Sequence, residues 1–358
     1  MKSAMFIHKS FKINGESFSS IEELILFSEG VSNEIAQFLK EWFNLEPFVE
    51  VKTSGSTGTP KIIQLQKALM INSAKATGAY FNIKENAKVL LCMSPNFIAG
   101  KMMLVRALTL GWHLDVVSAT SNPLKTIKKV YDFSAMVPLQ LHNSLPQINK
   151  IKKLIVGGGV VSEKLLNQLQ VIKTNVYATY GMTETITHIA VKKLNNFEGK
   201  ELNLNVKFNY ITLPNITVSK DYRGCLVINA PEVANELVIT NDLVELISET
   251  EFKWLGRFDT IINSGGVKLI PEQIEEKLAS IIQKRFFITG ISDPILGEKL
   301  ILLVEGKNDI SLESKLKKTT LLSKYEKPKE IYFINAFIET PTSKINRVET
   351  MKLLKNIY

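Results

Sequence analysis

The feature that most constrains the fold is a regular alternation of short apolar segments with helix-like segments between residues 88 and 169. Three strand-like segments are each followed by a helix-like segment. "KVLLCMS" (88–94) precedes "KMMLVRALTLG" (101–111), and "LDVVSA" (114–119) precedes "NPLKTIKKVYDF" (122–133). The stretch "KKLIVGGGVVSEKLLNQL" (152–169) begins as a strand, passes through three glycines and ends as a helix. This alternation predicts an α/β domain with a mostly parallel sheet, because parallel strands need a long crossover that is usually a helix. Ligands of such sheets bind at the carboxyl ends of the strands.

The pattern is different on both sides of this segment. Apolar residues at helical spacing predict two helices within residues 20–43. From about residue 200, short strands separated by turn signals lead to "FKWLGRFD" (252–259). A helix over 271–284, a strand, a lysine-rich helix and another strand follow. We therefore expect a large N-terminal domain over 1–256 and a small C-terminal α+β domain over 260–358.

The composition excludes several classes of protein. The chain has 358 residues, of which 45% are hydrophobic, as in a globular protein with room for more than one domain, and no apolar run reaches membrane-spanning length. The start has no signal-peptide pattern, and Cys92 and Cys225 indicate neither a disulfide framework nor a metal cluster. The net charge of +9 comes from dispersed lysines. We expect a cytoplasmic enzyme without a nucleic-acid partner.

Residues 53–61, "TSGSTGTPK", place small, hydroxylated and conformationally permissive residues next to a lysine. A P-loop requires Ser or Thr directly after its lysine and then a helix, whereas Lys61 leads into the strand-like "IIQL". The stretch is therefore either a solvent-exposed turn or a different phosphate cradle, in which backbone N–H groups and hydroxyls bind oxygen atoms.

The segment "YATYGMTETITHIA" (177–190) can also bind a nucleotide. A strand ends at Tyr180, whose ring can stack on a base, and the turn behind it presents Thr183 and Glu184. Carboxylate oxygens are the ligands that Mg²⁺ prefers, usually together with phosphate oxygens. The alternative is that the Thr–Glu pair only caps a helix.

Four charged residues in turn-rich surroundings complete the candidates, namely Asp242, Arg257, Asp259 and Lys344. A carboxylate can accept hydrogen bonds from ribose hydroxyls, and Arg or Lys can neutralise phosphate. Taken one at a time, each is more often a surface charge.

Five motifs occur in one order: "TSGSTGTPK", "YGMTET", "TND" (240–242), "GRFDTIINSGGVKLIPEQIE" (256–275) and "PTSKINR" (341–347). Because these five motifs occur in this order, the sequence resembles the adenylate-forming superfamily. This superfamily contains acyl-CoA synthetases, adenylation domains of peptide synthetases, and luciferases. The resemblance covers roughly residues 50–350. It implies that the C-terminal domain is a mobile lid with its hinge at Asp259.

The resemblance implies a ligase that works in two steps. A carboxylate attacks the α-phosphate of ATP and releases pyrophosphate, and a thiol, usually that of coenzyme A, then displaces AMP. The implied ligands are ATP, Mg²⁺, coenzyme A and a small carboxylic acid. Cations and oriented dipoles should stabilise the first transition state, because negative charge accumulates there.

The resemblance also implies the roles of the motif residues. The β- and γ-phosphates would contact Thr53, Ser54, Gly55, Ser56, Thr57, Gly58, Thr59 and Lys61. The catalytic groups would be Thr183 at the α-phosphate, Glu184 at Mg²⁺ and Lys344 between the reacting carboxylate and phosphate. The adenosine would contact Gly157, Gly158, Gly159, Tyr180, Gly181, Asp242 and Arg257. After the lid rotates, Gly265 and Gly266 would line the thiol channel.

The sequence departs from the family pattern at three places. Ser343 stands where a glycine usually precedes the final lysine, and Phe97 stands where many relatives have a histidine, so a gating role there is in doubt. The phosphate loop lies only about 50 residues from the start, so we expect most of the usual N-terminal subdomain to be missing.

Within the superfamily, the short length and "SPNFIAGKMMLVRAL" (94–108) make the chain resemble the o-succinylbenzoate–CoA ligases of menaquinone biosynthesis. The substrate's second carboxylate would need a cation or hydrogen-bond donors. Lys101 is the preferred candidate, Arg106 and His188 are alternatives, and Phe97 would contact the aromatic ring. Another aryl- or acyl-CoA ligase, an adenylation protein that loads a carrier, and an inactive nucleotide-binding relative are the competing interpretations. The sequence does not indicate the oligomeric state.

Overall fold

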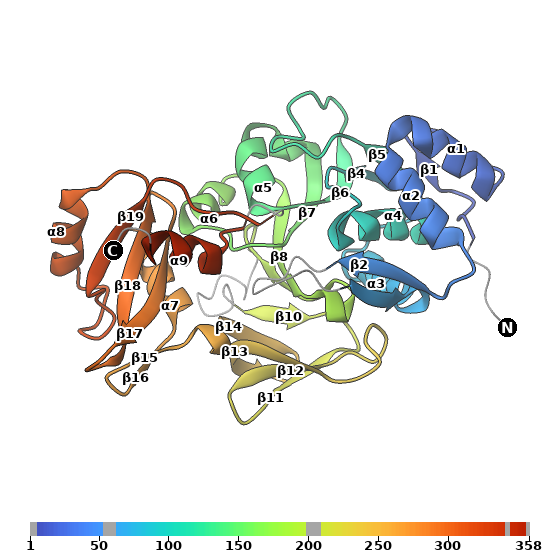
Figure 1. Cartoon of the computed structure of the whole chain (residues 1–358). Helices are drawn as coiled ribbons and strands as arrows, with labels where there is room; N and C mark the ends of the chain where they lie inside the picture. Colours follow the sequence, from blue (N-terminus) through green and yellow to red (C-terminus); the bar gives the residue numbers. More distant parts are fainter. Residues whose placement is uncertain (1–5, 53–61, 198–208, 341–343, 356–358) are drawn as a thin grey trace.

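The computed structural model describes residues 6–52, 62–197, 209–340 and 344–355 (Figure 1). The helices in these ranges are α1 (Ile21–Val31), α2 (Asn33–Phe43), α3 (Lys67–Tyr80), α4 (Ile98–Leu110), α5 (Pro138–Ser144), α6 (Glu163–Leu169), α7 (Pro271–Leu278), α8 (Ile310–Lys318) and α9 (Arg347–Lys355). None of these helices has the length and apolar character that crossing a bilayer requires.

One large mixed sheet organises the chain as far as residue 257. Its strands are, in spatial order, β1 (Lys12–Ile13), β5 (His113–Val116), β4 (Lys88–Leu91), β6 (Tyr131–Met136), β7 (Ile151–Val156), β8 (Asn175–Gly181), β9 (His188–Lys193), β10 (Tyr210–Thr212), β14 (Glu251–Arg257), β13 (Val238–Ser248), β12 (Cys225–Asn229) and β11 (Thr217–Lys220). Pairing is parallel from β1 to β8 and antiparallel from β8 to β11. The α/β class is thus confirmed, and four of the parallel strands, β4 to β7, come from the alternating segment.

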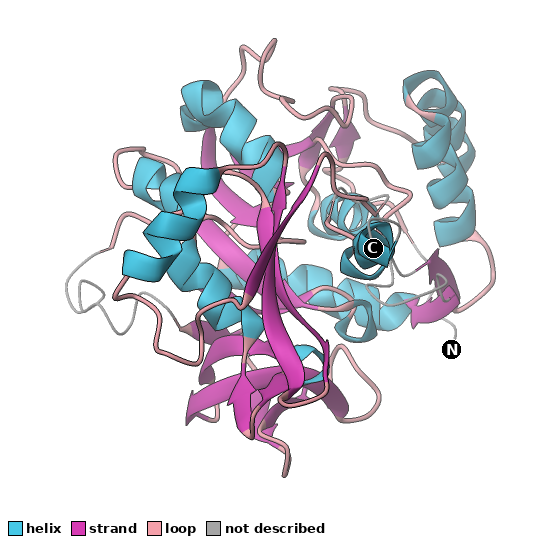
Figure 2. Ribbon diagram, turned by 60° about the vertical axis from the view of Figure 1, so that its left-hand side comes forward, coloured by secondary structure: helices cyan, strands magenta, loops and turns pink. Residues whose placement is uncertain are grey.

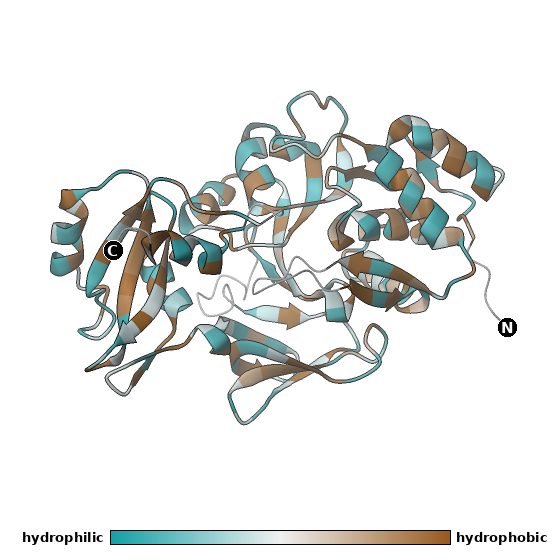
Figure 3. Ribbon diagram, viewed as in Figure 1, coloured by the Kyte–Doolittle hydropathy of each residue, from teal (hydrophilic) through white to brown (hydrophobic). Residues whose placement is uncertain are grey.

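The parallel strands are buried on both faces, as their continuous apolar sequences require. Val89 and Leu91 of β4 lie in a core shared with α3 and α4, whereas Leu90 lies in a second core with α5 and α6. Helices therefore cover both faces of this half of the sheet (Figure 1). Figure 3 shows hydrophobic and hydrophilic residues on different sides of the covering helices, as this packing demands.

The predicted helix over residues 122–133 is wrong. The structure has an irregular loop there, followed by β6, which lies between β4 and β7. Leu124, Ile127 and Tyr131 have helical spacing, but Leu124 anchors the loop in the core, Ile127 packs against it, and Tyr131 begins β6. The Tyr131 hydroxyl donates to Asp115 in β5 at 2.9 Å. Pairing within the sheet therefore overrides the local periodicity.

The other expected elements are present with shifted ends. The segment 20–43 forms α1 and α2, and the Ser20 side chain caps α1 by accepting from the Glu23 amide. The helix expected over 271–284 is α7, which ends at Leu278. A separate two-stranded ladder joins β2 (Phe48–Lys52) and β3 (Ile62–Gln66), the strands on either side of 53–61.

A smaller sheet follows residue 260 and has its own cores. It contains β16 (Val267–Leu269), β15 (Ile262–Ser264), β18 (Gly297–Glu305), β17 (Phe286–Asp293) and β19 (Glu330–Ile334). Its two clusters of buried residues are drawn from residues 262–354. Figure 2 brings this part forward and shows it in front of the larger sheet. The chain passes from one sheet to the other through a single 3₁₀ turn, Phe258–Thr260.

Asn195 is a buried polar residue that ties β8 to the end of α6. Its Oδ1 accepts from the Val176 amide at 2.9 Å, and its Nδ2 donates to the carbonyls of Leu169 and Thr174 at 3.0 and 2.9 Å. Asn195→Ala should lower the free energy of unfolding by about 3 kcal/mol, because it leaves buried backbone groups unpaired. Urea denaturation measures this. The exposed Asn167→Ala in α6 is the control, with a change within about 0.5 kcal/mol.

Candidate functional site

The carboxyl end of β8 leads into a tight turn that carries Thr183 and Glu184. Thr183–Thr185 form a 3₁₀ turn, and the chain then returns antiparallel to β8 as β9. A Cβ atom on Gly181 would lie 2.1 Å from the Thr187 carbonyl oxygen, so only glycine allows this return. Ile186 has φ of 64°, a rare conformation for a β-branched residue. This constrained turn leaves Glu184 exposed and Thr183 half-buried.

Tyr180, at the end of β8, reaches a carboxylate from the antiparallel half of the sheet. Its hydroxyl donates to Asp242 Oδ2 at 2.6 Å, and its ring packs edge-on against Phe252 of β14, with centroids 5.2 Å apart. Burial and the Asp242 carboxylate together raise the pKa of Tyr180 far above its ordinary value. The phenol therefore remains a hydrogen-bond donor at all physiological pH values.

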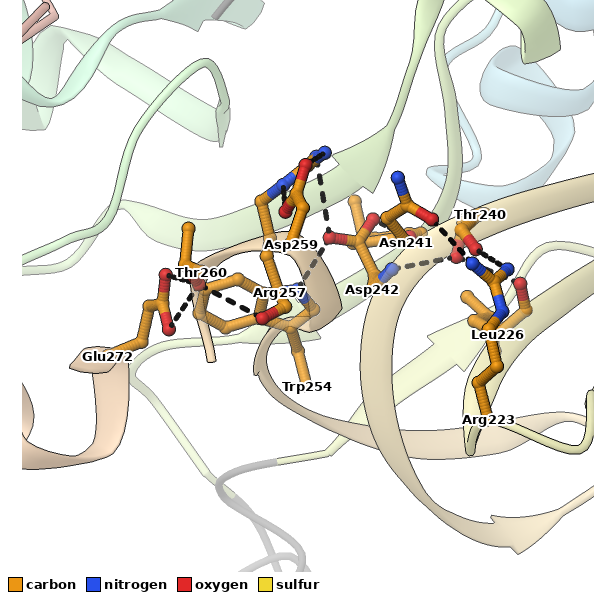
Figure 4. A network of polar contacts seen from close by, with 11 residues as sticks. Arg223, Leu226, Thr240, Asn241, Asp242, Trp254, Arg257, Asp259, Thr260 and Glu272 are labelled. Carbon is orange, nitrogen blue, oxygen red and sulfur yellow. Dashed lines mark hydrogen bonds and ion pairs between the residues drawn. The ribbon is translucent and has the colours of Figure 1, made fainter. Parts of the chain in front are cut away.

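Asp242 lies at the centre of a polar network at one end of β13 and β14 (Figure 4). Trp254 Nε1 donates to Asp242 Oδ1 at 3.1 Å, and Arg257 Nη1 lies 3.9 Å from the same oxygen. Arg257 donates to Asp259 through Nε and Nη2 at 2.9 and 2.8 Å. These two bonds lower the pKa of the Asp259 carboxyl. The network thus links the candidate ribose carboxylate to the turn between the two sheets.

Arg223 holds the "TND" segment in place from the neighbouring β11–β12 connection. Its Nη1 donates to Asn241 Oδ1 and its Nη2 to the Thr240 carbonyl, both at 2.9 Å. Its guanidinium carbon lies 5.3 Å from the centre of the Phe258 ring, next to Asp259. The part of β13 that carries Asp242 is therefore held in place by a cation.

The three glycines of the predicted adenine site follow β7. Val156, which ends β7, pairs with Ala178 of β8, so Gly157 lies beside Thr179 at the adjacent strand end. A Cβ on Gly157 would lie 2.6 Å from Thr179 Oγ1. Gly157, Gly158, Gly159, Tyr180 and Gly181 therefore gather at the carboxyl ends of two neighbouring strands, where an α/β sheet binds ligands.

The predicted lid residues belong to the smaller sheet and the segment behind it. Gly265 and Gly266, with φ of 58° and 80°, form the two-residue turn between β15 and β16, a conformation that suits glycine. Lys344 is exposed, and its amide donates to Thr340 Oγ1 at 3.1 Å. Desolvation by nearby protein lowers the pKa of its ammonium group. Asp259 lies within the 3₁₀ turn that joins the two sheets.

A buried guanidinium lies beneath the turn after β8. Arg106 of α4 is 2% exposed, and its donors meet only neutral atoms: Thr77 Oγ1 at 3.3 Å, Thr187 Oγ1 at 3.2 Å and Met103 Sδ at 3.7 Å. Among the described residues no carboxylate pairs with it. Burial lowers its pKa to about 10, so it is still charged at neutral pH.

His188 lies next to this guanidinium. Its Nδ1 is 3.3 Å from Thr187 Oγ1, and its Nε2 is buried without a hydrogen-bond partner in the described structure. Burial, together with the Arg106 charge, lowers the pKa of His188 to about 3. The imidazole is therefore neutral, and the Arg106–Thr187–His188 cluster carries one positive charge that no carboxylate within the described ranges compensates.

Lys101, the preferred candidate for the second carboxylate, faces another direction. It forms an ion pair with Glu41 of α2 at 3.1 Å, and its ammonium lies 4.8 Å from the centre of the Phe38 ring. Lys101 and Arg106 are separated by roughly 140° around α4, so one ligand group cannot bridge them. Phe97 is the N-cap residue of α4 and is 37% exposed. The substrate roles of Lys101 and Phe97 stay predictions.

Two parts of the predicted site lie outside the described residues. They are the phosphate loop, with Thr53, Ser54, Gly55, Ser56, Thr57, Gly58, Thr59 and Lys61, and residues 341–343 before Lys344. Conversely, reasoning from the sequence alone missed Thr187, Trp254 and Arg223. Thr187 lies two residues after the "YGMTET" motif and Trp254 lies three residues before Arg257, so proximity to a motif was the available signal.

The Lys101–Glu41 pair supports a stability test. Glu41→Gln leaves the mostly buried Lys101 ammonium without its partner, and the free energy of unfolding should fall by about 2–3 kcal/mol. Adding Lys101→Met to the Glu41→Gln variant should restore most of the lost stability, because no unpaired ammonium group then remains. Urea denaturation at neutral pH measures both variants. Glu29→Gln, which breaks the exposed pair with Lys40, should change stability by less than about 1 kcal/mol. A double variant as unstable as Glu41→Gln alone would contradict this structural role.

Comparisons with known proteins show which family the chain resembles. The family model described as "AMP-binding enzyme" matches residues 52–211. A 2-succinylbenzoate–CoA ligase from Enterococcus faecalis is 24% identical over 364 residues, which cover 92% of this chain and 74% of the relative. The structure of o-succinylbenzoate coenzyme A synthetase from Bacillus subtilis, in complex with ATP and magnesium ion, has a TM-score of 0.72 at 19% identity, covering 84% of this chain and 69% of that one. At 19% identity, the similarity to this structure shows that the two chains share a fold, and no more than that.

A second solved structure is more similar in sequence. It is an acyl-CoA synthetase (AMP-forming)/AMP-acid ligase II-like protein from Dyadobacter fermentans, with 38% identity and a TM-score of 0.58. The alignment covers 90% of this chain and 93% of that chain. The chain therefore belongs to the AMP-binding, adenylate-forming family of acid–CoA ligases.

Proposed function

We propose that this chain activates o-succinylbenzoate with ATP and transfers the acyl group to coenzyme A. The observation that carries the substrate assignment is the buried Arg106 guanidinium, which lacks an anionic partner among the described residues. A buried charge without a partner is costly, so such a group is typically paired with an anion when the protein is in its working state. Relatives that act on 2-succinylbenzoate, such as the Enterococcus faecalis enzyme, support the same choice.

In this proposal Arg106 binds the aryl carboxylate, the one that does not react. The hydroxyls of Thr77 and Thr187 already orient the guanidinium, and the unpartnered Nε2 of His188 supplies a further polar contact. Because His188 is neutral, it adds no second positive charge next to Arg106. This assignment replaces Lys101, because Glu41 already compensates the Lys101 charge.

The succinyl carboxylate then reacts in two steps. One of its oxygens attacks the α-phosphorus of ATP, the bond to the bridging oxygen of the β-phosphate breaks, and pyrophosphate leaves. The coenzyme A sulfur next attacks the acyl carbon, its proton passes to solvent, and AMP leaves as the carbon–oxygen bond breaks. Residues 53–61, Thr183 and Lys344 would neutralise the phosphate charge of the first step.

The nucleotide would occupy the carboxyl ends of β7 and β8. Adenine would lie between Tyr180 and Gly157–Gly159, and Asp242 with Arg257 would bind the ribose. The described residues contain no cluster of three or more side chains that could hold a metal ion. The single exposed carboxylate of Glu184 therefore fits Mg²⁺ that takes its other ligands from phosphate and water, and the ion would supply charge neutralisation.

We further propose that residues 1–256 and 260–358 act as two domains hinged at Asp259. The single short connection, Phe258–Thr260, and the separate cores of the smaller sheet support this division. Rotation would withdraw Lys344 after adenylation and bring Gly265 and Gly266 to the thiol path.

The substrate assignment is tested by carboxylate-dependent pyrophosphate release over a panel of acids, with and without coenzyme A. The wild type should prefer o-succinylbenzoate over 4-oxo-4-phenylbutanoate, which lacks the aryl carboxylate, by roughly 100-fold in kcat/KM. Arg106→Met should lose this preference, because the cation that selects the aryl carboxylate is gone.

Lys101→Met is the matched control and should keep the preference, although it lowers stability. Equal use of both acids by the wild type would reject the o-succinylbenzoate assignment while leaving an acyl-CoA ligase. Thioester formed on a carrier protein but not on free coenzyme A would favour the carrier-loading function instead.

The lid proposal is tested by separating the two half-reactions. Lys344→Ala should slow adenylation by roughly 100-fold or more, because a cation at the transition state is lost. Thioester formation from supplied acyl-adenylate should stay within a few-fold of wild type. Lys352→Ala, an exposed lysine in α9, is the control for loss of charge and should leave both rates unchanged. Equal losses in both half-reactions for Lys344→Ala would contradict the rotation.

A further inference from the structure

We propose that Trp254 is a positioning residue for the nucleotide: its indole N–H fixes the Asp242 carboxylate for recognition of the ribose hydroxyls. The inference rests on the proposed function, in which Asp242 binds the ribose of ATP. It adds a residue outside the sequence motifs and predicts how ATP is distinguished from nucleotides that lack a hydroxyl.

The Asp242 carboxylate is held by one neutral donor on each oxygen. Trp254 Nε1 donates to Oδ1 at 3.1 Å (Figure 4). The Tyr180 hydroxyl donates to Oδ2 at 2.6 Å. Asp242 is only 8% exposed, and its amide donates to Thr240 Oγ1 at 3.0 Å. A carboxylate accepts about four hydrogen bonds. Two acceptor positions in a fixed plane therefore remain for the two adjacent hydroxyls of a ribose.

Arg257 is the weaker candidate for this orienting role. It lies 3.9 Å from Asp242 Oδ1, beyond hydrogen-bond distance, and its Nε and Nη2 are engaged by Asp259. Trp254 is therefore the donor in direct contact with Oδ1. It also adds no charge, so the carboxylate keeps its full ability to accept from hydroxyl donors.

The position of Trp254 depends on a β-bulge. Asp242 pairs with Arg257 and Leu243 with Gly256, but Val244 pairs with Trp254, so Leu255 is the extra residue on β14. Without the bulge, residues 254 and 257 would project from opposite faces of the strand, because side chains alternate. The extra residue brings Trp254 and Arg257 onto the face of Asp242, and re-aiming a side chain is a recognised use of bulges.

A buried tryptophan elsewhere in the chain shows that an indole N–H does not require such a bond even in the core. Trp112 is fully buried, and its Nε1 has no hydrogen-bond partner in the described part of the chain. The protein thus tolerates an unpaired indole N–H in its core. Trp112→Phe is therefore a matched control, which makes the same substitution without removing a bond to the site.

The test measures pyrophosphate release with o-succinylbenzoate and with ATP, 2′-deoxyATP or 3′-deoxyATP. The wild type should prefer ATP over at least one deoxynucleotide by about 10-fold or more in kcat/KM, as expected for a hydrogen bond to a charged group. Trp254→Phe should raise the KM for ATP by roughly 5- to 10-fold. It should leave the KM for that deoxynucleotide within about 2-fold, so that the preference largely disappears.

Each outcome has a distinct meaning. If the wild type discriminates and Trp254→Phe discriminates equally, the Trp254 inference is overturned and the ribose role of Asp242 survives. If the wild type does not discriminate, the ribose role fails and the inference fails with it. Trp112→Phe should retain the full preference, and a loss there would assign the effect to general destabilisation and overturn the inference. Trp254→Leu, which also lacks the donor, replaces Trp254→Phe if the latter does not fold.

Discussion

The close approach of Gly181 to the Thr187 carbonyl is the constraint on which the site depends. Because residue 181 has no side chain, the chain can reverse at the end of the last parallel strand and continue as an antiparallel one. The same reversal presents Glu184 to solvent and carries Thr187 and His188 down to Arg106. The nucleotide side and the acid side of the proposed site are thus two faces of one turn.

Local patterns in the sequence were enough to predict the α/β architecture. The strands β4 and β7 and the helices α4 and α6 follow directly from apolar periodicity, since both faces of the parallel strands are buried. The motifs also predicted which separate segments carry the candidate site. Tyr180, Asp242, Arg257 and Asp259 lie far apart in the chain, and the structure brings them into one network.

Features that depend on a partner elsewhere in the chain could not be predicted. The spacing of Leu124 and Ile127 suits a helix, but pairing of β6 between β4 and β7 decides that region. Lys101 and Arg106 are both cations in the sequence, and the position of Glu41 in the structure shows which charge is already compensated. The burial of a charge and its pairing are properties of tertiary structure.

The bulge at Leu255 has a consequence for comparing relatives of this chain. Strand β14 is one residue longer than its partner strand at this point, so its length, and not only its composition, determines which side chains meet Asp242. Regular pairing that kept Leu255 would turn the indole to the opposite face while leaving every motif letter intact. A relative that has a residue at position 255 but pairs these strands without the bulge must therefore orient its carboxylate with some other group.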